Sequence, residues 1–281
     1  MKKILFVLAN LMILTACGDK SKKDYLVTIK TSYGDMKVLL YEETPLHKEN
    51  FIELAKSGRY DSTIFHRVIE NFMIQGGNIY EKEGTREPEN ARIPAEIIEG
   101  FYHTRGALAA ARQPDNVNPE KLSSSCQFYI IDGNSWEVMS TDQRLLNQKL
   151  TELLEDPEYS ELLAKFQELA KNRDSNGMNN LALENKALVE EKFGIDLTID
   201  PKTGNNEAYK ELGGYHYLDN DYTVFGKVVD GLDVIDKIAA VKKGGPNQSR
   251  PIEPIYLTME VEEVKKKEIT KLYGYEYPSK K

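Results

Sequence analysis

The chain has 281 residues, of which 40% are hydrophobic, so it is long enough to bury a sizeable core. Its formal net charge of -8 argues against a nucleic-acid partner, because phosphate binding requires clustered lysine and arginine. Two cysteines are present, Cys17 and Cys126, and whether they can pair depends on the N-terminal segment.

The N-terminal segment has the pattern of a targeting signal. Lys2 and Lys3 precede an apolar stretch at residues 4–14, which is shorter than a typical transmembrane helix. The four residues Leu14-Thr15-Ala16-Cys17 resemble the lipobox of bacterial lipoproteins, in which the cysteine is lipidated and becomes the new N-terminus. The alternative is an ordinary signal peptide with an incidental cysteine. We predict a signal peptide at residues 1–16 and lipidation of Cys17, which leaves no intramolecular disulfide.

The predicted anchor also implies a location. Residues 17–24 are a polar linker, and the seven residues after Cys17 reach about 25 Å when extended, which would keep the folded part close to its membrane. Asp19 lies two residues after the cysteine instead of next to it, so the commonest signal for retention in the inner membrane is absent. We expect a monomer in the cell envelope, lipid-anchored in the outer membrane and facing the periplasm.

The first folded elements are expected at Tyr25–Tyr41, a β-hairpin in which two apolar runs flank a turn at Tyr33-Gly34-Asp35. Thr44 and Pro45 then predict the start of a helix, as N-cap and first-turn residue, and Ser57-Gly58 predicts its end. The buried stripe of this helix is expected at Leu46, Asn50, Phe51 and Leu54, with His47 at the surface.

The most informative stretch is residues 64–77. A strand at residues 64–69 is followed by a turn at Glu70-Asn71 and a second apolar run that ends in two glycines. Alternation would place Phe65, Arg67 and Ile69 on one side, which puts a permanent cation on an apolar face. Arg67 either extends to solvent or is aimed at a ligand, and Phe72, Met73 and Gln75 follow at once.

This stretch, F-H-R-V-I, a turn and F-M-I-Q-G-G, resembles the signature of the cyclophilins, which are peptidyl-prolyl cis/trans isomerases. The resemblance extends over residues 25–131 and 212–261. It implies a mainly β fold, a closed antiparallel eight-stranded barrel with two covering helices. Its further matches are Pro45, Asn50, Phe51, Tyr60-Asp61, the small residues 106–112, the strand Ser124–Ile131 and the run Tyr217–Val228.

The family pattern is interrupted by a predicted helical insertion at residues 132–211. Ser140 with Gln143 reads as a capping box, Pro157 opens a second leucine-rich helix, and a weaker third helix ends at Gly194. The insertion has 17 acidic and 9 basic residues, so it carries most of the negative charge. We expect a small bundle at the rim of the groove, and the alternative is a lengthened loop that folded on itself. Residues 262–281 are expected to form a polar tail.

The resemblance implies a groove in which Arg67 and Gln75 are catalytic. It assigns substrate binding to Phe72, Met73, Gln127, Tyr129, Tyr217, Leu218 and Tyr222. The implied substrates are proline-containing unfolded proteins or peptides, with no cofactor and no metal. Tyr217 and Tyr222 depart from the tryptophan and histidine of the best-known members, which puts tight cyclosporin binding in doubt. Cys126 should point into the barrel wall as a small hydrophobe.

Two other classes of protein remain open. The chain is either an isomerase, a catalytically idle cyclophilin-like binding or chaperone module that acts through the insertion, or a helical docking protein whose barrel is a scaffold. The intact set of Arg67, Phe72, Gln75 and Tyr129 favours the enzyme.

Overall fold

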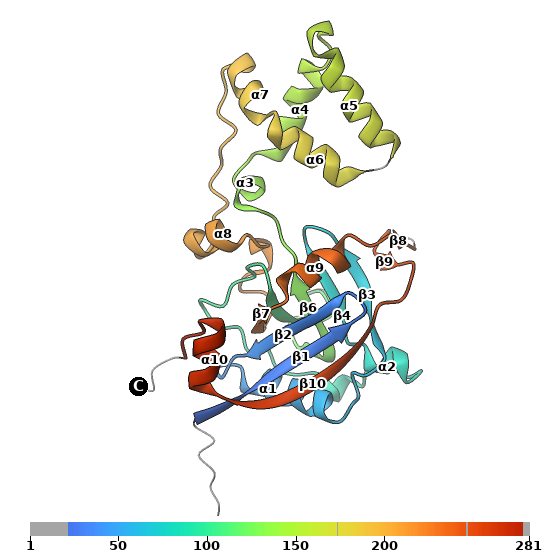
Figure 1. Cartoon of the computed structure of the whole chain (residues 1–281), viewed down its shortest axis with the longest axis vertical. Helices are drawn as coiled ribbons and strands as arrows, with labels where there is room; N and C mark the ends of the chain where they lie inside the picture. The colour runs from blue at the N-terminus through green and yellow to red at the C-terminus, as the bar shows by residue number, and fades with distance from the viewer. Residues whose placement is uncertain (1–21, 173, 246, 278–281) are drawn as a thin grey trace, which may run out of the picture.

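Eight antiparallel strands close into a barrel in the order β1-β10-β3-β4-β6-β5-β7-β2 (Figure 1). The computed structural model describes residues 22–172, 174–245 and 247–277, so the signal segment and the lipidation site Cys17 lie outside the described residues. The mainly β barrel that the sequence predicts is confirmed. Its strands are β1 Lys23–Thr31, β2 Gly34–Leu40, β3 Thr63–Ile69, β4 Met73–Gly76, β5 Ala107–Arg112, β6 Ser123–Ile131, β7 Val224–Asp230 and β10 Tyr256–Lys265.

Two helices complete the core of the barrel. The helix α1 (Pro45–Lys56) and the helix α9 (Leu232–Ala239) each bury one face in the same cluster as the inward side chains of the strands. Alternation along each strand supplies those inward side chains, and a spacing of three to four residues supplies the helical faces. The buried helical residues are Phe51, Ile52, Leu54 and Ala55 of α1 and Val234, Ile235, Ile238 and Ala239 of α9.

The start of α1 differs from its prediction. Thr44 occupies the N-cap position, but its side chain makes no capping hydrogen bond. The first free N–H groups of the helix, those of Leu46 and His47, instead donate to the carboxylate of Glu96, each at 3.0 Å. Glu96 also lies 2.6 Å from Nδ1 of His47, which is 2% exposed, so its prediction as a surface residue is wrong. Burial lowers the pKa of His47, and Glu96 partly opposes that shift.

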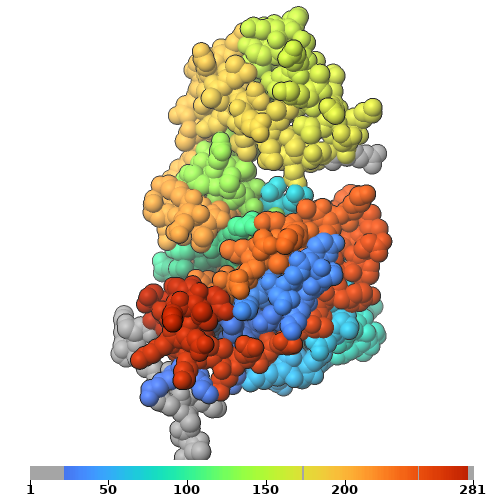
Figure 2. Space-filling view, in the orientation of Figure 1, coloured from blue at the N-terminus to red at the C-terminus, as the bar shows by residue number. Residues whose placement is uncertain are grey.

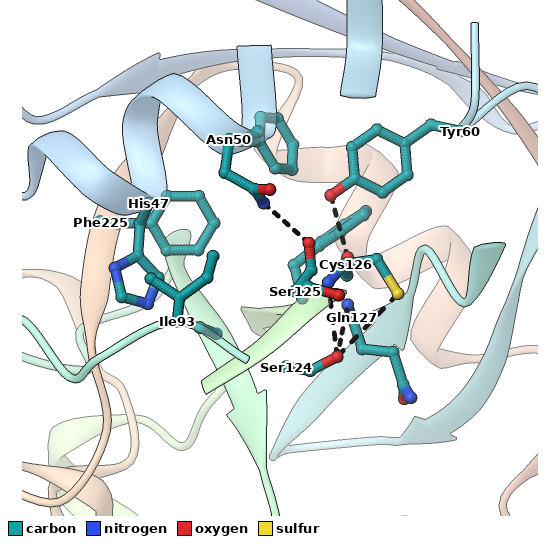
Figure 3. Close-up of a pocket in the computed structure, with 12 residues that line it drawn as sticks. His47, Asn50, Tyr60, Ile93, Ser124, Ser125, Cys126, Gln127 and Phe225 are labelled. Carbon is teal, nitrogen blue, oxygen red and sulfur yellow. Dashed lines mark hydrogen bonds between the residues drawn. The ribbon is translucent and has the colours of Figure 1, made fainter. Parts of the chain in front are cut away.

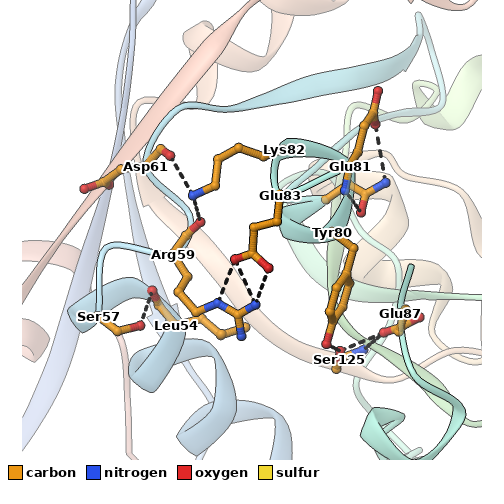
Figure 4. Close-up of polar contacts among 11 residues, drawn as sticks. Leu54, Ser57, Arg59, Asp61, Tyr80, Glu81, Lys82, Glu83, Glu87 and Ser125 are labelled. Carbon is orange, nitrogen blue, oxygen red and sulfur yellow. Dashed lines mark hydrogen bonds and ion pairs between the residues drawn. The ribbon is translucent and has the colours of Figure 1, made fainter. Parts of the chain in front are cut away.

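The segment after β4 is tied to the end of α1. The short helix α2 (Ile79–Lys82) is followed by Glu83, whose carboxylate accepts a forked pair of hydrogen bonds from Arg59 (Figure 4). Lys82 donates to the carbonyls of Arg59 and Asp61. A 3-10 turn at Glu89–Ala91 (η2) follows in the polar loop after α2. The loop is therefore held to the barrel by ion pairs and main-chain contacts.

The helices of residues 132–211, the segment predicted to be an insertion, lie above one end of the barrel (Figure 1 and Figure 2). The helices α4, α6 and α7 surround a separate apolar core, as expected for a small bundle; its buried members are Leu146, Leu150, Leu153, Ala182, Val189 and Leu197. The helical segments are α3 Trp136–Met139, α4 Gln143–Leu153, η3 Pro157–Tyr159, α5 Ser160–Lys171, α6 Ser175–Glu184, α7 Lys186–Phe193 and α8 Asn206–Leu212.

Two details of the insertion correct the sequence prediction. Ser140 ends α3, and Asp142 is the N-cap of α4, where its side chain accepts from the N–H of Leu145 at 2.9 Å. A carboxylate at the N-cap also interacts favourably with the helix dipole, which explains why Asp142 replaces Ser140. The weak third helix is in fact two helices, α6 and α7, and Gly194 ends the second in the left-handed conformation, as predicted.

The last described residues, up to Tyr277, lie on the side of the barrel near its first strand. The last strand β10 continues to Lys265 and is followed by the helix α10 (Lys266–Tyr273), so the expected tail is structured over much of its length. Tyr277 donates to the carboxylate of Asp24 at 3.1 Å, and Tyr275 stacks near Tyr41. A two-stranded sheet, β8 Lys243–Gly244 with β9 Arg250–Pro251, and the 3-10 turn η4 His216–Leu218 complete the fold. Among the residues described, no helix is both long and apolar enough to span a membrane.

Candidate active site

A β-bulge in β3 sets the position of Arg67. Phe65 pairs with Gly76 and Arg67 pairs with Gln75. These two pairs are consecutive on β4, so β3 carries one extra residue, His66, between them. The bulge breaks the alternation on which the sequence prediction rested. Phe65 is therefore buried in the barrel together with Val68, and the expectation that Phe65 and Arg67 share one side is wrong. Arg67 projects outward instead, where its guanidinium can meet a ligand.

A row of polar side chains crosses three neighbouring strands at this point. Nη1 of Arg67 on β3 donates to Oε1 of Gln75 on β4 at 3.1 Å. Nε2 of Gln75 donates in turn to Oε1 of Gln127 on β6, also at 3.1 Å. A guanidinium carries five N–H donors, so Arg67 keeps most of its donors for a ligand while Gln75 fixes its orientation.

The row borders a pocket of about 260 Å³ on the outer face of the barrel. Its floor belongs to a second apolar cluster, separate from the barrel core, that includes Met73 and Tyr129 together with the half-buried Phe72, Leu218 and Tyr222. The guanidinium carbon of Arg67 lies 5.8 Å from the ring centre of Phe72. The residues that line the pocket are Arg67, Phe72, Met73, Gln75, Ala111, Arg112, Tyr129, Leu218 and Tyr222.

Seven of the nine residues predicted for the site line this pocket. Gln127 lies beside it and contacts it through Gln75. The structure does not bring Tyr217 to the pocket: its side chain is 71% exposed, and its ring lies 4.0 Å from that of His216. The tyrosine ring that packs against the site is that of Tyr215, whose centre is 4.3 Å from the ring of Phe72.

Tyr129 is held by a buried histidine that the sequence analysis did not single out. The hydroxyl of Tyr129 lies 2.9 Å from Nε2 of His103, and Nδ1 of His103 lies 3.0 Å from Oδ1 of Asp219. Burial lowers the pKa of His103, against the opposing effect of Asp219, so the ring is neutral. A neutral ring beside a carboxylate carries its proton on Nδ1, and Nε2 then accepts from Tyr129. The hydroxyl is thereby turned away, and the apolar ring of Tyr129 faces the pocket.

The far end of the pocket is formed by a second arginine, Arg112. Its guanidinium lies 4.4 Å from the ring centre of Tyr222, and its Nε donates to the carbonyl of Asp221 at 2.8 Å. Its Nη1 donates to Asp115 at 2.5 Å, and the side chain is 4% exposed. Arg112 therefore acts as a fixed wall that holds Tyr222, whereas Arg67 is exposed. The sequence placed Arg112 at the end of a run of small residues but gave no signal for this role.

The strand β6 is braced by side chains of α1 and of the segment before β3 (Figure 3). Asn50 donates to the carbonyl of Ser125 at 2.7 Å, and Tyr60 donates to the carbonyl of Cys126 at 2.9 Å. Cys126 is 3% exposed within the barrel core, and burial raises the pKa of its thiol to about 11, so it serves as the predicted small hydrophobe and not as a nucleophile. The N–H of Gln127 donates to the hydroxyl of Ser124 at 3.2 Å, which fixes the start of the polar row.

The sequence matches the family of cyclophilin-type peptidyl-prolyl cis-trans isomerases over residues 26–151 and 158–261. The match covers well over half of the chain, and the closed barrel with its outer pocket agrees with it. The chain therefore belongs to the cyclophilin-type peptidyl-prolyl cis-trans isomerases.

Named bacterial relatives support this assignment. A peptidyl-prolyl cis-trans isomerase of Acinetobacter baylyi is 34% identical over 143 residues, which are 50% of this chain and 72% of the relative. A Staphylococcus aureus protein whose name assigns it provisionally to the same enzymes is 27% identical over 240 residues, 84% of this chain and 91% of the relative. A Streptococcus pyogenes protein, named provisionally as a bifunctional phosphatase and isomerase, is 30% identical over 84% of this chain, which spans only 38% of that relative.

Solved structures with a similar arrangement have low sequence identity to the chain. A cyclophilin-type isomerase of Cryptosporidium parvum superposes with a TM-score of 0.49 at 19% identity, covering 86% of this chain and 97% of that one. A cyclophilin of Hirschia baltica gives a TM-score of 0.46 at 17% identity, covering 86% of this chain and 77% of that one.

Proposed function

We propose that the chain accelerates rotation about X-Pro bonds in folding proteins of the bacterial cell envelope, with Arg67 and Gln75 as its catalytic residues. Rotation about a peptide bond faces a barrier of about 18–20 kcal/mol, because the nitrogen lone pair is shared with the carbonyl. Without a catalyst an X-Pro bond takes tens to hundreds of seconds to isomerise. A catalyst needs to hold the proline ring and to favour the twisted state in which the nitrogen becomes pyramidal.

The position of Arg67 suits the second task. A guanidinium remains charged, and it can donate toward the proline nitrogen only when that nitrogen is pyramidal and its lone pair is free. The interaction therefore favours the transition state over the ground state, which is the condition for raising kcat. Gln75 restrains the guanidinium from one side and offers its remaining amide capacity to the carbonyl that rotates or to the substrate main chain.

The pocket suits the first task. Phe72, Met73 and Tyr129 offer an apolar floor for the proline ring, and Leu218 and Tyr222 border it. Gln127 restrains Gln75 and would help to hold the residue that precedes proline. Because Tyr217 is directed to solvent, we assign Tyr215, not Tyr217, to the aromatic support of Phe72.

The observation that carries the proposal is an exposed guanidinium fixed by Gln75 at the edge of an apolar pocket. Arg67→Ala should lower kcat/KM for a short Ala-Pro peptide by about 10²-fold or more, the loss expected when one preorganised donor is removed. Arg67→Lys should not restore activity, because an ammonium cannot copy the planar fork. Circular dichroism controls for folding. Wild-type activity in the alanine variant would show that Arg67 is not catalytic, and an inactive wild-type protein would identify the chain as a binding module without catalysis.

For the location, we propose a lipid anchor at Cys17 in the outer membrane, facing the periplasm. The support is the apolar run that ends at this cysteine and the short polar segment before β1. Cys17→Ser should abolish fatty-acid labelling and release the protein from the membrane fraction while the barrel remains folded. Unchanged labelling in that variant would remove the anchor from the proposal.

A further inference from the structure

A second cleft lies between the barrel and the inserted helices, next to the proposed active site. It measures about 420 Å³, within the range of ligand sites. Six of its nine lining residues carry side-chain amides: Asn71, Asn134, Gln143, Asn147, Asn179 and Asn180. The other three are Ser135, Val138 and Leu183, so none of the described residues that line it is charged.

The walls of this amide cleft are built by regular spacing. Gln143 and Asn147 are four residues apart on α4 and therefore share one face of that helix. Asn179 and Leu183 are likewise four apart on α6. The barrel side is supplied by Asn71, which lies in the turn between β3 and β4 at a φ of 61°.

Asn71 connects the cleft to the active-site pocket. Its N–H donates to Asp132 at 2.6 Å, and its side chain donates to Oδ1 of Asn176 on α6 at 2.9 Å. The next residue is Phe72, which lines the pocket, and its carbonyl accepts from the N–H groups of Asp132 and Gly133. One short, fixed turn therefore forms a wall of both the pocket and the cleft.

Most of the amides in the cleft are available to a ligand. In the part of the chain that the structure describes, the side-chain amides of Asn134, Asn147, Asn179 and Asn180 have no hydrogen-bond partner. A primary amide both donates and accepts hydrogen bonds, as the peptide group does. A neutral row of amides therefore fits a polymer that presents N–H and C=O groups in alternation, and it offers no charge for an ion.

We propose that the amide cleft binds the extended main chain of the unfolded substrate, on one side of the proline that occupies the pocket. This inference rests on the proposed isomerase function and extends its substrate from a short peptide to a longer unfolded segment. A glycan is the less suitable ligand, since sugar rings favour aromatic surfaces and none of the described side chains that line the cleft is aromatic.

The test compares two substrates with the same Ala-Pro bond. One is a tetrapeptide, about 13 Å when extended, and the other has about twelve residues, roughly 40 Å when extended, with neutral Ser, Thr, Gln and Gly flanks. In the variant Asn147→Ala/Asn179→Ala/Asn180→Ala, KM for the long peptide should rise about tenfold, because up to three hydrogen bonds are lost. The tetrapeptide should be turned over as by the wild type. Alanine favours helix, so the fold is not at risk.

A matched control removes amides outside the cleft. Gln148→Ala/Gln167→Ala changes exposed glutamines on α4 and α5 and should leave KM for both peptides as in the wild type. An equal loss of both activities in the asparagine variant would show that the amides belong to the pocket. Unchanged KM for the long peptide would likewise overturn the inference.

A binding measurement separates this inference from the catalytic proposal. On addition of a proline-free peptide with the same neutral flanks, the side-chain amide signals of Asn147, Asn179 and Asn180 should shift in NMR spectra. That shift should persist in Arg67→Ala, whether or not catalysis is lost. Shifts caused by a soluble N-acetylglucosamine hexasaccharide, and not by the peptide, would assign the cleft to a glycan and overturn the inference.

Discussion

The barrel and the inserted helices differ in how they are stabilised. Among the described residues, the barrel core includes 28 buried residues, most of them from its strands, α1 and α9, whereas the separate core of the insertion has six. In the barrel the sheet is closed, so each strand is hydrogen-bonded to a neighbour on both sides. In the insertion, by contrast, the helix α5 has no fully buried side chain. The insertion also carries 17 acidic and 9 basic residues, which leaves the rest of the chain near neutral.

This difference predicts which region can unfold locally or be deleted without destabilising the other. Few buried apolar contacts give a region a low free energy of local unfolding. We therefore expect the bundle α4–α7 to open more readily than the barrel. The exception is α8, which lies within the insertion but packs on the barrel: Tyr209 is fully buried, and its hydroxyl donates to Oδ2 of Asp219 at 2.7 Å.

The largest effect on stability and activity is expected from the choice of end points when the insertion is deleted. Thr141 and Thr198 form an antiparallel bridge, so joining them through a short glycine-containing turn removes residues 142–197 without opening the barrel. The shortened protein should turn over the tetrapeptide at the wild-type rate. Removal of residues 132–211 also deletes Tyr209, and loss of a large buried ring costs about 3–5 kcal/mol.

The two deletions control for each other. The deletion of residues 132–211 should lower the midpoint of thermal unfolding, measured by calorimetry. It should also reduce tetrapeptide turnover at least several-fold, measured by a proline-isomerisation assay. If the shorter deletion abolishes tetrapeptide turnover while its circular dichroism keeps the barrel signature, the helices α4–α7 are part of the catalytic site. The conclusion that the barrel functions independently of these helices would then be wrong.

A core substitution in the bundle should separate the two regions further. Leu150 is 3% exposed in the core of the insertion, and Leu150→Ala should destabilise the bundle by about 2–5 kcal/mol. Hydrogen exchange should accelerate in α4, α6 and α7 and remain slow in β1, β2 and β6. The matched substitution Leu40→Ala in the barrel core, where Leu40 is 1% exposed, should lower the global midpoint instead. Equal protection loss in both regions would mean that they unfold as one unit.

The sequence predicted the barrel and most of the pocket because their signals are local. The signature at residues 64–77 is uninterrupted, and strands β3 and β4 bring its parts together by direct pairing. Seven pocket residues could therefore be identified from the family resemblance. The bulge at His66 was missed, because alternation assumes a regular strand and nothing in the composition marks the irregularity.

The missed contacts join loops that are distant in sequence. His47 with Glu96, and His103 with Asp219, are pairs of ordinary polar residues separated by 49 and 116 positions. No periodic pattern connects them, and a lone histidine on a helix is usually exposed. The amide cleft was missed for the same reason, since Asn71 and Asn179 come from different regions that only the fold brings together.

A single hydroxyl links α8 to the active-site pocket. Tyr209→Phe removes the donor to Asp219, which then holds His103 less firmly, and His103 orients Tyr129. A hydrogen bond to a charged group contributes about 1.5–3 kcal/mol, so the free energy of unfolding should fall by that amount. KM for the tetrapeptide should rise more than kcat falls, because the floor of the pocket is loosened. An unchanged urea midpoint would show that Tyr209 acts only through packing of its ring.

Acidification should destabilise the protein through its buried histidines. Burial lowers the pKa of His103, His47 and the half-buried His66, although a nearby carboxylate partly opposes the shift for each of them. The unfolded chain takes up these protons near pH 6.5, whereas the folded chain does not. Stability is therefore complete above about pH 6.5 and falls below it, by up to about 1.4 kcal/mol per pH unit for each histidine.

Urea unfolding at about pH 7.5 and about pH 5.5 measures how the free energy of unfolding changes with pH. In His103→Gln this change should be smaller by the contribution of one histidine proton. Asp219, Tyr129 and Tyr222 surround the ring, and its charged form is favoured by Asp219 and, to a smaller extent, by Asp221. A midpoint that does not change between these pH values would mean that the histidines are protonated in the fold as in the unfolded chain.

The smallest effect concerns the acidic surface of the insertion. Its excess of acidic residues should attract basic unfolded proteins, although the amide cleft itself is neutral. Exposed charges are screened beyond about 10 Å at 0.1 M salt, so affinity for a basic unfolded client should fall several-fold between low and high salt. The protein without residues 142–197 should lose this salt dependence, and an acidic client should show none in either protein. Equal salt slopes for the full and shortened proteins would place the attraction on the barrel.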